Sequence, residues 1–169
     1  MSDAPLLKVI APGLSTTVQD RGRFGWQRYG VPVSGALDPV ALAAANIVVG
    51  NEPGCAGLEC LYQGPVLEVI AESSRIAVAG DGAALEIIGP DAERLRCGAC
   101  ESVRTARGSR IRVVIAGPSI GAYLAVEGGF AVPIIMDSRS TYARASIGGY
   151  KGRPLREGDA VPLALGDVG

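Results

Sequence analysis

The sequence contains no histidine, and its aromatic residues are limited to two Phe, one Trp and five Tyr in 169 positions. The missing imidazole excludes Ser-His and Cys-His catalytic pairs, His-ligated zinc and imidazole acid–base catalysis. Any chemistry must therefore use carboxylates, Arg, Lys, Tyr, hydroxyls, amides or backbone groups.

Charge and long apolar runs are also scarce. Charged residues make up 20% of the chain and the formal net charge is −1, which favours no polyanion-binding surface. No uninterrupted apolar run approaches the roughly 20 residues that span a bilayer, and the N-terminus has no basic stretch followed by an apolar one. We expect a cytoplasmic protein that binds neither nucleic acid nor membrane.

In that compartment the four cysteines should remain reduced thiols. The Cys97-x2-Cys100 pair, taken with Cys55 and Cys60, admits a zinc site as an alternative. The loose spacing of the first pair and its apolar surroundings favour small buried thiols instead, so no metal site is expected.

Glycine and proline are abundant, with 24 and 11 residues, and short Val/Ile/Leu runs lie between them. Such a pattern is typical of many short strands joined by tight turns. Strands are expected at 6–10, 15–20, 66–71, 75–79, 84–88, 111–116 and 122–126. The highly charged stretch 91–108 predicts a surface hairpin or excursion. Together these features predict a mainly β protein, an antiparallel barrel forming one domain over residues 1–169.

One helix interrupts the strands. Asp38 is a good N-cap, Pro39 suits the first helical position, and Gly50 suits the position just after the end. The body of the helix is apolar all round, which predicts burial on most faces. Its single interior polar side chain, Asn46, needs hydrogen-bond partners. We expect them in the backbone near residues 19–22.

Two polar clusters are candidate sites. In the first, a strand end presents Gln19, Asp20 and two arginines beside aromatic residues, an arrangement that suits a small anion. The alternative, favoured by local sequence alone, is a surface turn in which Asp20 pairs with Arg21 or Arg23.

The second cluster is Ser138-Arg139-Ser140-Thr141, with the glycine pair 148–149 shortly after it. A guanidinium flanked by hydroxyls suits a carboxylate or a phosphate, and a polar loop at a strand end is an equal alternative. Neither a Walker motif nor Gly-x-Gly-x-x-Gly after a strand occurs, so nothing indicates nucleotide binding by this chain alone.

Six motifs follow one another along the chain in an order and spacing typical of a known family: PGLSTTVQDRGRFG, GVPVSGALDP, ANIVVGN, YLAVEGGF, SRSTY and GRPLREGDAVPL. The chain resembles in these motifs the allophanate hydrolase subunit 2 proteins of the biotin-dependent carboxyltransferase family, whose members include the C subunits of bacterial 5-oxoprolinases. It departs from the family at Leu37, where Met is usual, and at Asp137, where Gly is usual.

The resemblance implies a cyclophilin-like β-barrel, matching the N-terminal half of a tandem-barrel subunit about twice as long. It also implies a heteromeric ATP-dependent complex with A-like and B-like subunits that hydrolyses 5-oxoproline to L-glutamate, in which this chain binds no cofactor itself. The alternatives are the carboxyltransferase part of a biotin-dependent urea or amide carboxylase, with biotin on a separate carrier, or a non-catalytic protein-binding module.

Site residues follow from the same resemblance. Arg139 is expected to bind a substrate carboxylate or a developing oxyanion, while Asp20 and Gln19 orient a reacting amide or water. Arg23 is expected to hold Asp20 ionised. The candidate substrate-binding residues are Arg23, Asn46, Ser138, Ser140 and Thr141.

Overall fold

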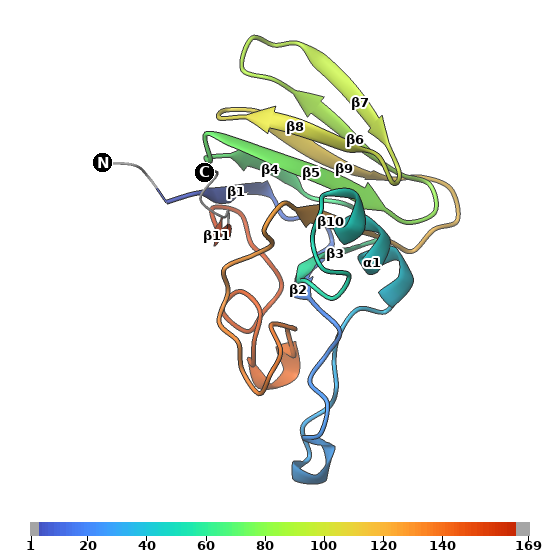
Figure 1. The fold of residues 1–169 in the computed structure, drawn as a ribbon, viewed down its shortest axis with the longest axis vertical. Coiled ribbons are helices and arrows are strands. Elements are labelled where there is room, and N and C mark those ends of the chain that lie inside the picture. The colour runs from blue at the N-terminus through green and yellow to red at the C-terminus, as the bar shows by residue number, and fades with distance from the viewer. Residues whose placement is uncertain (1–3, 165–169) are drawn as a thin grey trace.

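The computed structural model of the chain describes residues 4–164 and consists of short strands with one α-helix (Figure 1). The strands are β1 (Leu6–Ala11), β2 (Ser15–Gln19), β3 (Gly57–Leu61), β4 (Val66–Val69), β5 (Ser73–Ala79), β6 (Ala83–Ile88), β7 (Arg94–Gly98), β8 (Ser102–Ala106), β9 (Arg110–Ile115), β10 (Gly121–Val126) and β11 (Ala160–Pro162). The helices are α1 (Pro39–Val48) and two 3-10 turns, η1 (Gln27–Tyr29) and η2 (Ala143–Ala145).

The strands form two antiparallel sheets, in the orders β11-β1-β4-β9-β6-β7 and β2-β3-β10-β5-β8. Side chains alternate along each strand, as in β1, where Leu7 and Val9 are buried and Lys8 between them is exposed. Most buried side chains of the two sheets form one apolar core, and a second, smaller cluster lies between α1 and the strands β5 and β10. The expected mainly antiparallel β fold with one principal helix is confirmed.

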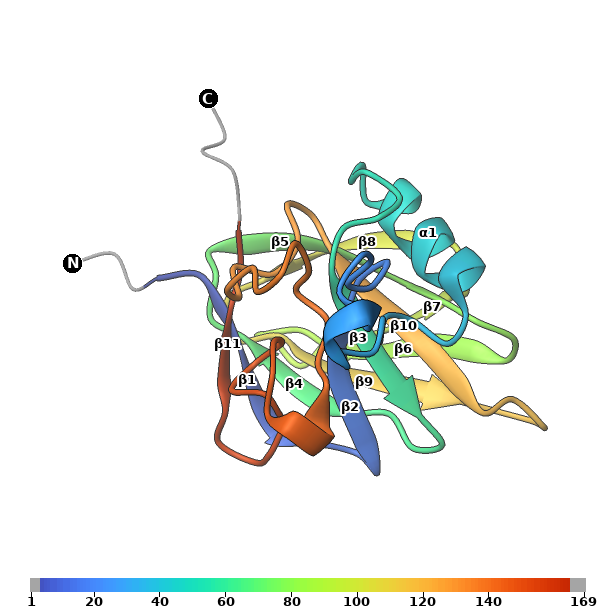
Figure 2. The ribbon, with the colours of Figure 1, turned by 90° about the horizontal axis from the view of Figure 1, so that it is seen from below.

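An irregular segment, residues 127–159, closes the side where β2 and β11 would leave free edges. The backbone N–H of Thr141 donates to Val18 O at 2.9 Å, and that of Leu155 donates to Thr16 O at 2.8 Å. The segment lies beside β2 in both ribbon views (Figures 1 and 2). Because it is held along β2, it places residues 138–141 next to the point where that strand ends.

The charged stretch 91–108 does not form a surface hairpin, which was one of the two forms expected for it. Its two strands belong to different sheets, since β7 pairs with β6 and β8 pairs with β5. Each is the edge strand of its sheet, and charged side chains are common on edge strands because they face solvent. The charge of the stretch therefore does not require its two strands to pair with each other. The stretch therefore links the two sheets.

Helix α1 begins and ends as predicted. The Asp38 carboxylate accepts the backbone N–H groups of Val40 and Ala41, and Gly50 takes a positive φ of 86° just past the end. The expected burial on most faces is wrong, because Val40 is 76% and Ile47 59% exposed. Only one face packs on β5 and β10. No helix within residues 4–164 combines the length and apolarity needed to cross a bilayer.

Candidate functional site

The two polar clusters of the sequence meet at the Asp20 carboxylate. Its Oδ1 accepts Ser138 Oγ at 2.7 Å, Gly22 N at 2.8 Å and Ser140 Oγ, and its Oδ2 accepts the backbone N–H of Arg139 at 2.6 Å. The Asp20 N–H in turn donates to Ser140 Oγ at 2.9 Å. Residues more than a hundred positions apart are thereby joined through one side chain.

These hydrogen bonds determine the ionisation of Asp20. Burial alone would raise its pKa, but donation from Ser140, from the Arg139 and Gly22 backbone and from Ser138 lowers the pKa below its ordinary value of 3.8. The carboxylate is therefore ionised near neutral pH, with most of its lone pairs engaged. Such a group positions its donors and is a poor general base.

Arg23 does not form the ion pair that was expected to hold Asp20 ionised. Its side chain is fully buried, its Nε donates to Ile135 O at 3.2 Å and its Nη2 donates to Ser140 O at 2.7 Å. Burial lowers the pKa of Arg23, and the Asp20 charge raises it at longer range. The residue fastens the chain after β2 onto the segment around residue 140.

Gln19 and Thr141 are buried beside this junction. The Gln19 amide donates to Thr17 Oγ1 at 3.0 Å and to Thr141 O at 3.3 Å, and Thr141 Oγ1 donates to Val18 O. Gly148 is packed so closely that a Cβ there would collide with the Ser140 carbonyl, and its φ of +69° also requires glycine. These groups support the junction from its buried side.

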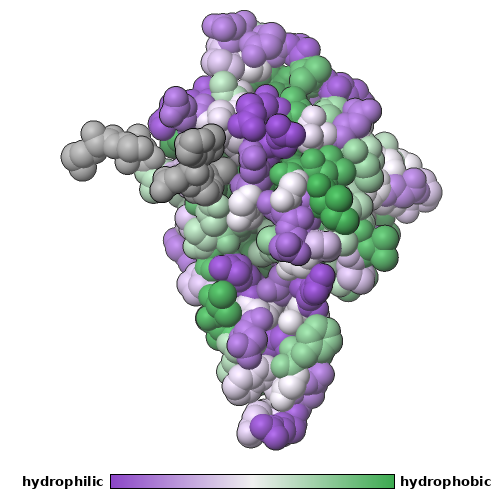
Figure 3. Space-filling model, in the orientation of Figure 1, coloured by the Kyte–Doolittle hydropathy of each residue, from purple (hydrophilic) through white to green (hydrophobic). Residues whose placement is uncertain are grey.

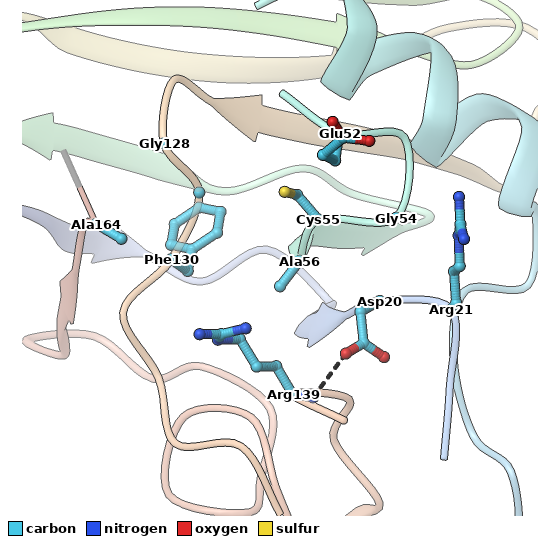
Figure 4. Close-up of a pocket in the computed structure, with 11 residues that line it drawn as sticks. Asp20, Arg21, Glu52, Gly54, Cys55, Ala56, Gly128, Phe130, Arg139 and Ala164 are labelled. Carbon is cyan, nitrogen blue, oxygen red and sulfur yellow. Dashed lines mark hydrogen bonds between the residues drawn. The ribbon is translucent and has the colours of Figure 1, made fainter. Parts of the chain in front are cut away.

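A cavity of about 370 Å³ opens beside the junction, and Asp20 and Arg139 line it. Arg139 Nε donates to Val132 O at 3.1 Å. Within residues 4–164, no hydrogen-bond or ion-pair partner engages its two terminal nitrogens. In Figure 4 the Arg139 guanidinium points toward Phe130 and Ala56, which also line the cavity. The geometry leaves a two-pronged donor available to an anion.

Arg21, one of the two arginines of the first polar cluster, also lines the cavity. The rest of the wall was not anticipated from the sequence: it is formed by Glu52 with the turn 54–56, by residues 128–130 and by Ala164 (Figure 4). Gly54 allows the Arg21 side chain to pass closely, since a Cβ there would lie 2.4 Å from Arg21 Nε. Glu52 follows the ANIVVGN motif directly, but a single exposed carboxylate offers no signal by itself.

Asn46 is fully buried, as expected, but its predicted contact with the backbone of residues 19–22 is wrong. Its Nδ2 donates to Cys55 O at 2.8 Å, and its Oδ1 accepts Asn51 Nδ2 at 3.0 Å. The helix end therefore holds the turn after α1, and through that turn it supports the cavity wall. Asn46 itself is not among the residues that line the cavity.

Of the eight residues predicted for the site, the structure brings seven together around the β2 end and places Asn46 behind the opposite wall. Only Asp20 and Arg139 line the cavity. The hydroxyls of Ser138 and Ser140 donate to Asp20, which leaves Arg139 as the group free to bind an anion. Within the described residues, no group of three or more His, Cys, Asp or Glu side chains is arranged to hold a metal ion.

Comparisons with known proteins identify the family of the chain. The family model described as carboxyltransferase domain, subdomain A and B, matches residues 29–167. The C subunit of the 5-oxoprolinase of Escherichia coli (strain K12) is 36% identical over 161 residues, which cover 94% of this chain and 49% of that protein. This chain thus spans about half the length of that relative.

The urea amidolyase of Lachancea kluyveri is also 36% identical, over 157 residues that cover 92% of this chain and 8% of that protein. Among solved structures, the K. lactis urea amidolyase superimposes with a TM-score of 0.89 at 34% identity, over 100% of this chain and 10% of that one. The resemblance drawn from the sequence motifs is confirmed.

Proposed function

Because the chain belongs to the family of carboxyltransferase domains that includes the 5-oxoprolinase C subunit, we propose that it serves an ATP-dependent 5-oxoprolinase complex with A-like and B-like subunits. The complex opens the lactam of 5-oxoproline by hydrolysis, giving L-glutamate. In this proposal ATP is used by the complex, and this chain contributes substrate binding.

The observation that carries the proposal is that the two terminal nitrogens of Arg139 are unengaged in a cavity of about 370 Å³. The substrate carries one carboxylate, and a guanidinium binds a carboxylate through two parallel hydrogen bonds. Asp20 orients this group because its Oδ2 accepts the Arg139 backbone N–H. Asp20 is thus a positioning residue, and Ser138 and Ser140 act through it.

A second candidate function is the carboxyltransferase part of a biotin-dependent urea or amide carboxylase. It is favoured by the urea amidolyase relative, which is as similar in sequence as the 5-oxoprolinase relative. The same Arg139 donors suit a carboxylate in transfer. Residues 1–169 contain no Met-Lys attachment motif, so biotin would be attached outside this stretch.

The proposal is tested by 5-oxoproline-dependent ATP hydrolysis after this chain is mixed with A-like and B-like subunits from the same organism. Arg139→Lys keeps the charge but loses the planar pair of donors, and it should lower kcat/KM by roughly 10- to 100-fold, or about 1.4–2.7 kcal/mol. Arg75→Lys, at an exposed position of β5, is the matched control and should be neutral.

Thermal melts of both variants separate a binding role from a structural one. Lost activity with an unchanged melt supports the assignment, whereas full activity of Arg139→Lys removes this residue from the site. Urea-dependent ATP hydrolysis with a biotinylated carrier, in the absence of any response to 5-oxoproline, would favour the carboxylase alternative.

A further inference from the structure

Residues 21–36 form an arm that leaves the body of the molecule after β2 and returns to it before α1. Figure 1 shows the arm as the lowest part of the chain, and in Figure 2 its η1 turn faces the viewer. The base is closed by two backbone hydrogen bonds, from Ala36 N to Asp20 O at 3.0 Å and from Arg23 N to Val33 O at 2.7 Å. The buried Arg23 side chain fixes this base to the junction.

Beyond its base the arm projects from the body, and it forms the narrow lower end of the space-filling view (Figure 3). Gly25 and Gly30 have no heavy atom within 4 Å of the position of an added Cβ. The hydrogen bonds that Gly25, Tyr29 and Gly30 donate all end within the tip itself. Within residues 21–36 only Gly22 and Arg23, both at the base, are buried, and Ala36 packs on the α1 cluster where the arm returns to the body. The body therefore neither covers nor uses the tip.

The composition of the tip is unusual for a free surface. Phe24, Trp26 and Tyr29 are three of the eight aromatic residues in the whole chain, and they fall within six positions. Phe24 is 64% and Tyr29 63% exposed. The Arg28 guanidinium lies 4.8 Å from the centre of the Tyr29 ring, and the Trp26 and Tyr29 rings are 6.0 Å apart. Trp, Tyr and Arg are the residue types that dominate binding energy at protein interfaces.

Charge indicates what kind of surface receives the arm. Residues 21–36 contain three arginines and no carboxylate. A complementary receptor is an apolar groove with an acidic rim. None of the four best-formed cavities found within residues 4–164 would give a second copy of this chain such a groove. In the cavity described above, Asp20 and Glu52 are offset by Arg21 and Arg139, and three further cavities each hold more cationic than anionic groups.

We propose that this arm docks into an acidic-rimmed apolar groove of a different polypeptide, which is a partner subunit of the complex. The inference rests on the proposed function only for the identity of that partner. Phe24 and Tyr29 are the anchors that enter the groove, and Arg28 faces its carboxylate rim. Arg21, at the base of the arm, also lines the cavity, so a partner that follows the arm from its tip to its base reaches the mouth of the cavity.

The test measures binding of the full chain to the purified B-like subunit from the same organism by isothermal titration calorimetry. The double variant Phe24→Ser, Tyr29→Ser should bind on the order of 100-fold more weakly, because two exposed aromatic anchors are removed. Arg28→Gln should lower the dependence of affinity on salt.

The matched control is Tyr62→Ser. Tyr62 is also 63% exposed, but it follows β3 at the Ser15 end of β2, opposite to the end that carries the arm. This control should bind as the parent does. Thermal melts of all variants should coincide with that of the parent, because the altered side chains contact solvent.

The outcomes separate the arm from the proposed function. Parental affinity in the double variant would overturn the docking role of the arm and leave the proposed complex intact. No binding by the parent chain would overturn both the docking and the B-like partner. Self-association of the chain that disappears in the double variant would show that a second copy occupies the arm, which also overturns the proposal.

Discussion

The Asp20 carboxylate offers the sharpest test of how the site is assembled. Asp20→Asn preserves size and shape but replaces one carboxylate oxygen by an NH₂ group. Three donors face Oδ1 and the Arg139 N–H faces Oδ2, so either orientation of the amide brings a donor against a donor. The Asn side chain therefore leaves at least one buried N–H or hydroxyl group without an acceptor.

The magnitude follows from these contacts. An unpaired backbone N–H destabilises the folded state by roughly 1–3 kcal/mol, and the other three bonds each lose about 0.5 kcal/mol when the acceptor becomes neutral. The free energy of unfolding should thus fall by about 3 kcal/mol. For a domain of this size that corresponds to a melting temperature about 6–12 °C lower. Asp81→Asn, at an exposed position in a turn, is the control and should change little.

The effect should also depend on pH. The pKa of Asp20 is lower in the folded state than its ordinary value of 3.8, so its stabilisation is fully present above that value. As pH falls through the folded pKa, the parent loses this contribution and approaches the variant. Urea unfolding at pH 7, 5, 4 and 3 measures the difference. A variant within about 0.5 kcal/mol of the parent at pH 7 would refute the reasoning, as would a difference that is unchanged at pH 3.

Two further predictions concern buried groups. Asn46→Leu should lower the free energy of unfolding by about 2 kcal/mol, because Cys55 O loses its donor and one of the two Asn51 amide bonds is lost. Ile47→Leu, on the exposed side of α1, should stay within about 0.5 kcal/mol in the same urea titration. Burial raises the pKa of Cys60 to about 12, so its thiol should resist a disulfide reagent at pH 8 until the chain is unfolded. Exposed Cys100 should react in the native state. Rapid labelling of Cys60 in the native protein, measured by peptide mass spectrometry, would contradict this prediction.

Much of the fold could be predicted from local pattern. The α1 cap, the glycine after its end and the strands β1, β2, β4, β5, β6, β9 and β10 are all signalled within short windows. Strand β3 was missed because the charged Glu59 interrupts its apolar run. In the structure Glu59 is buried and accepts Tyr123 OH at 2.7 Å and Leu37 N at 2.8 Å, from partners that are remote in the chain. A single sequence does not reveal such compensation.

The site shows the same limit. The residue types of both polar clusters were recognised from the sequence. Which of them bind a ligand and which support the site depends on contacts such as those of Ser138 and Ser140 with Asp20, about 120 positions away. Arg23 and Arg139 are equally good anion binders by residue type, yet one is fully buried against carbonyl groups and the other faces a cavity. Burial therefore separates the supporting arginine from the one available to a ligand.

The placement of charges around the cavity indicates where the remaining chemistry must come from. Asp20 has most of its lone pairs engaged, histidine is absent, and the other carboxylate lining the cavity belongs to exposed Glu52. The site thus holds two guanidinium groups that can bind an anion. None of the described residues that line it is a buried base with free lone pairs. A partner docked on the arm would approach the cavity beside Arg21, because that residue belongs to both. In the proposed complex, binding of the anion by Arg139 and delivery of the reacting groups by the partner would then occur at the same end of β2, where Asp20 and Arg23 hold Arg139 and the base of the arm together.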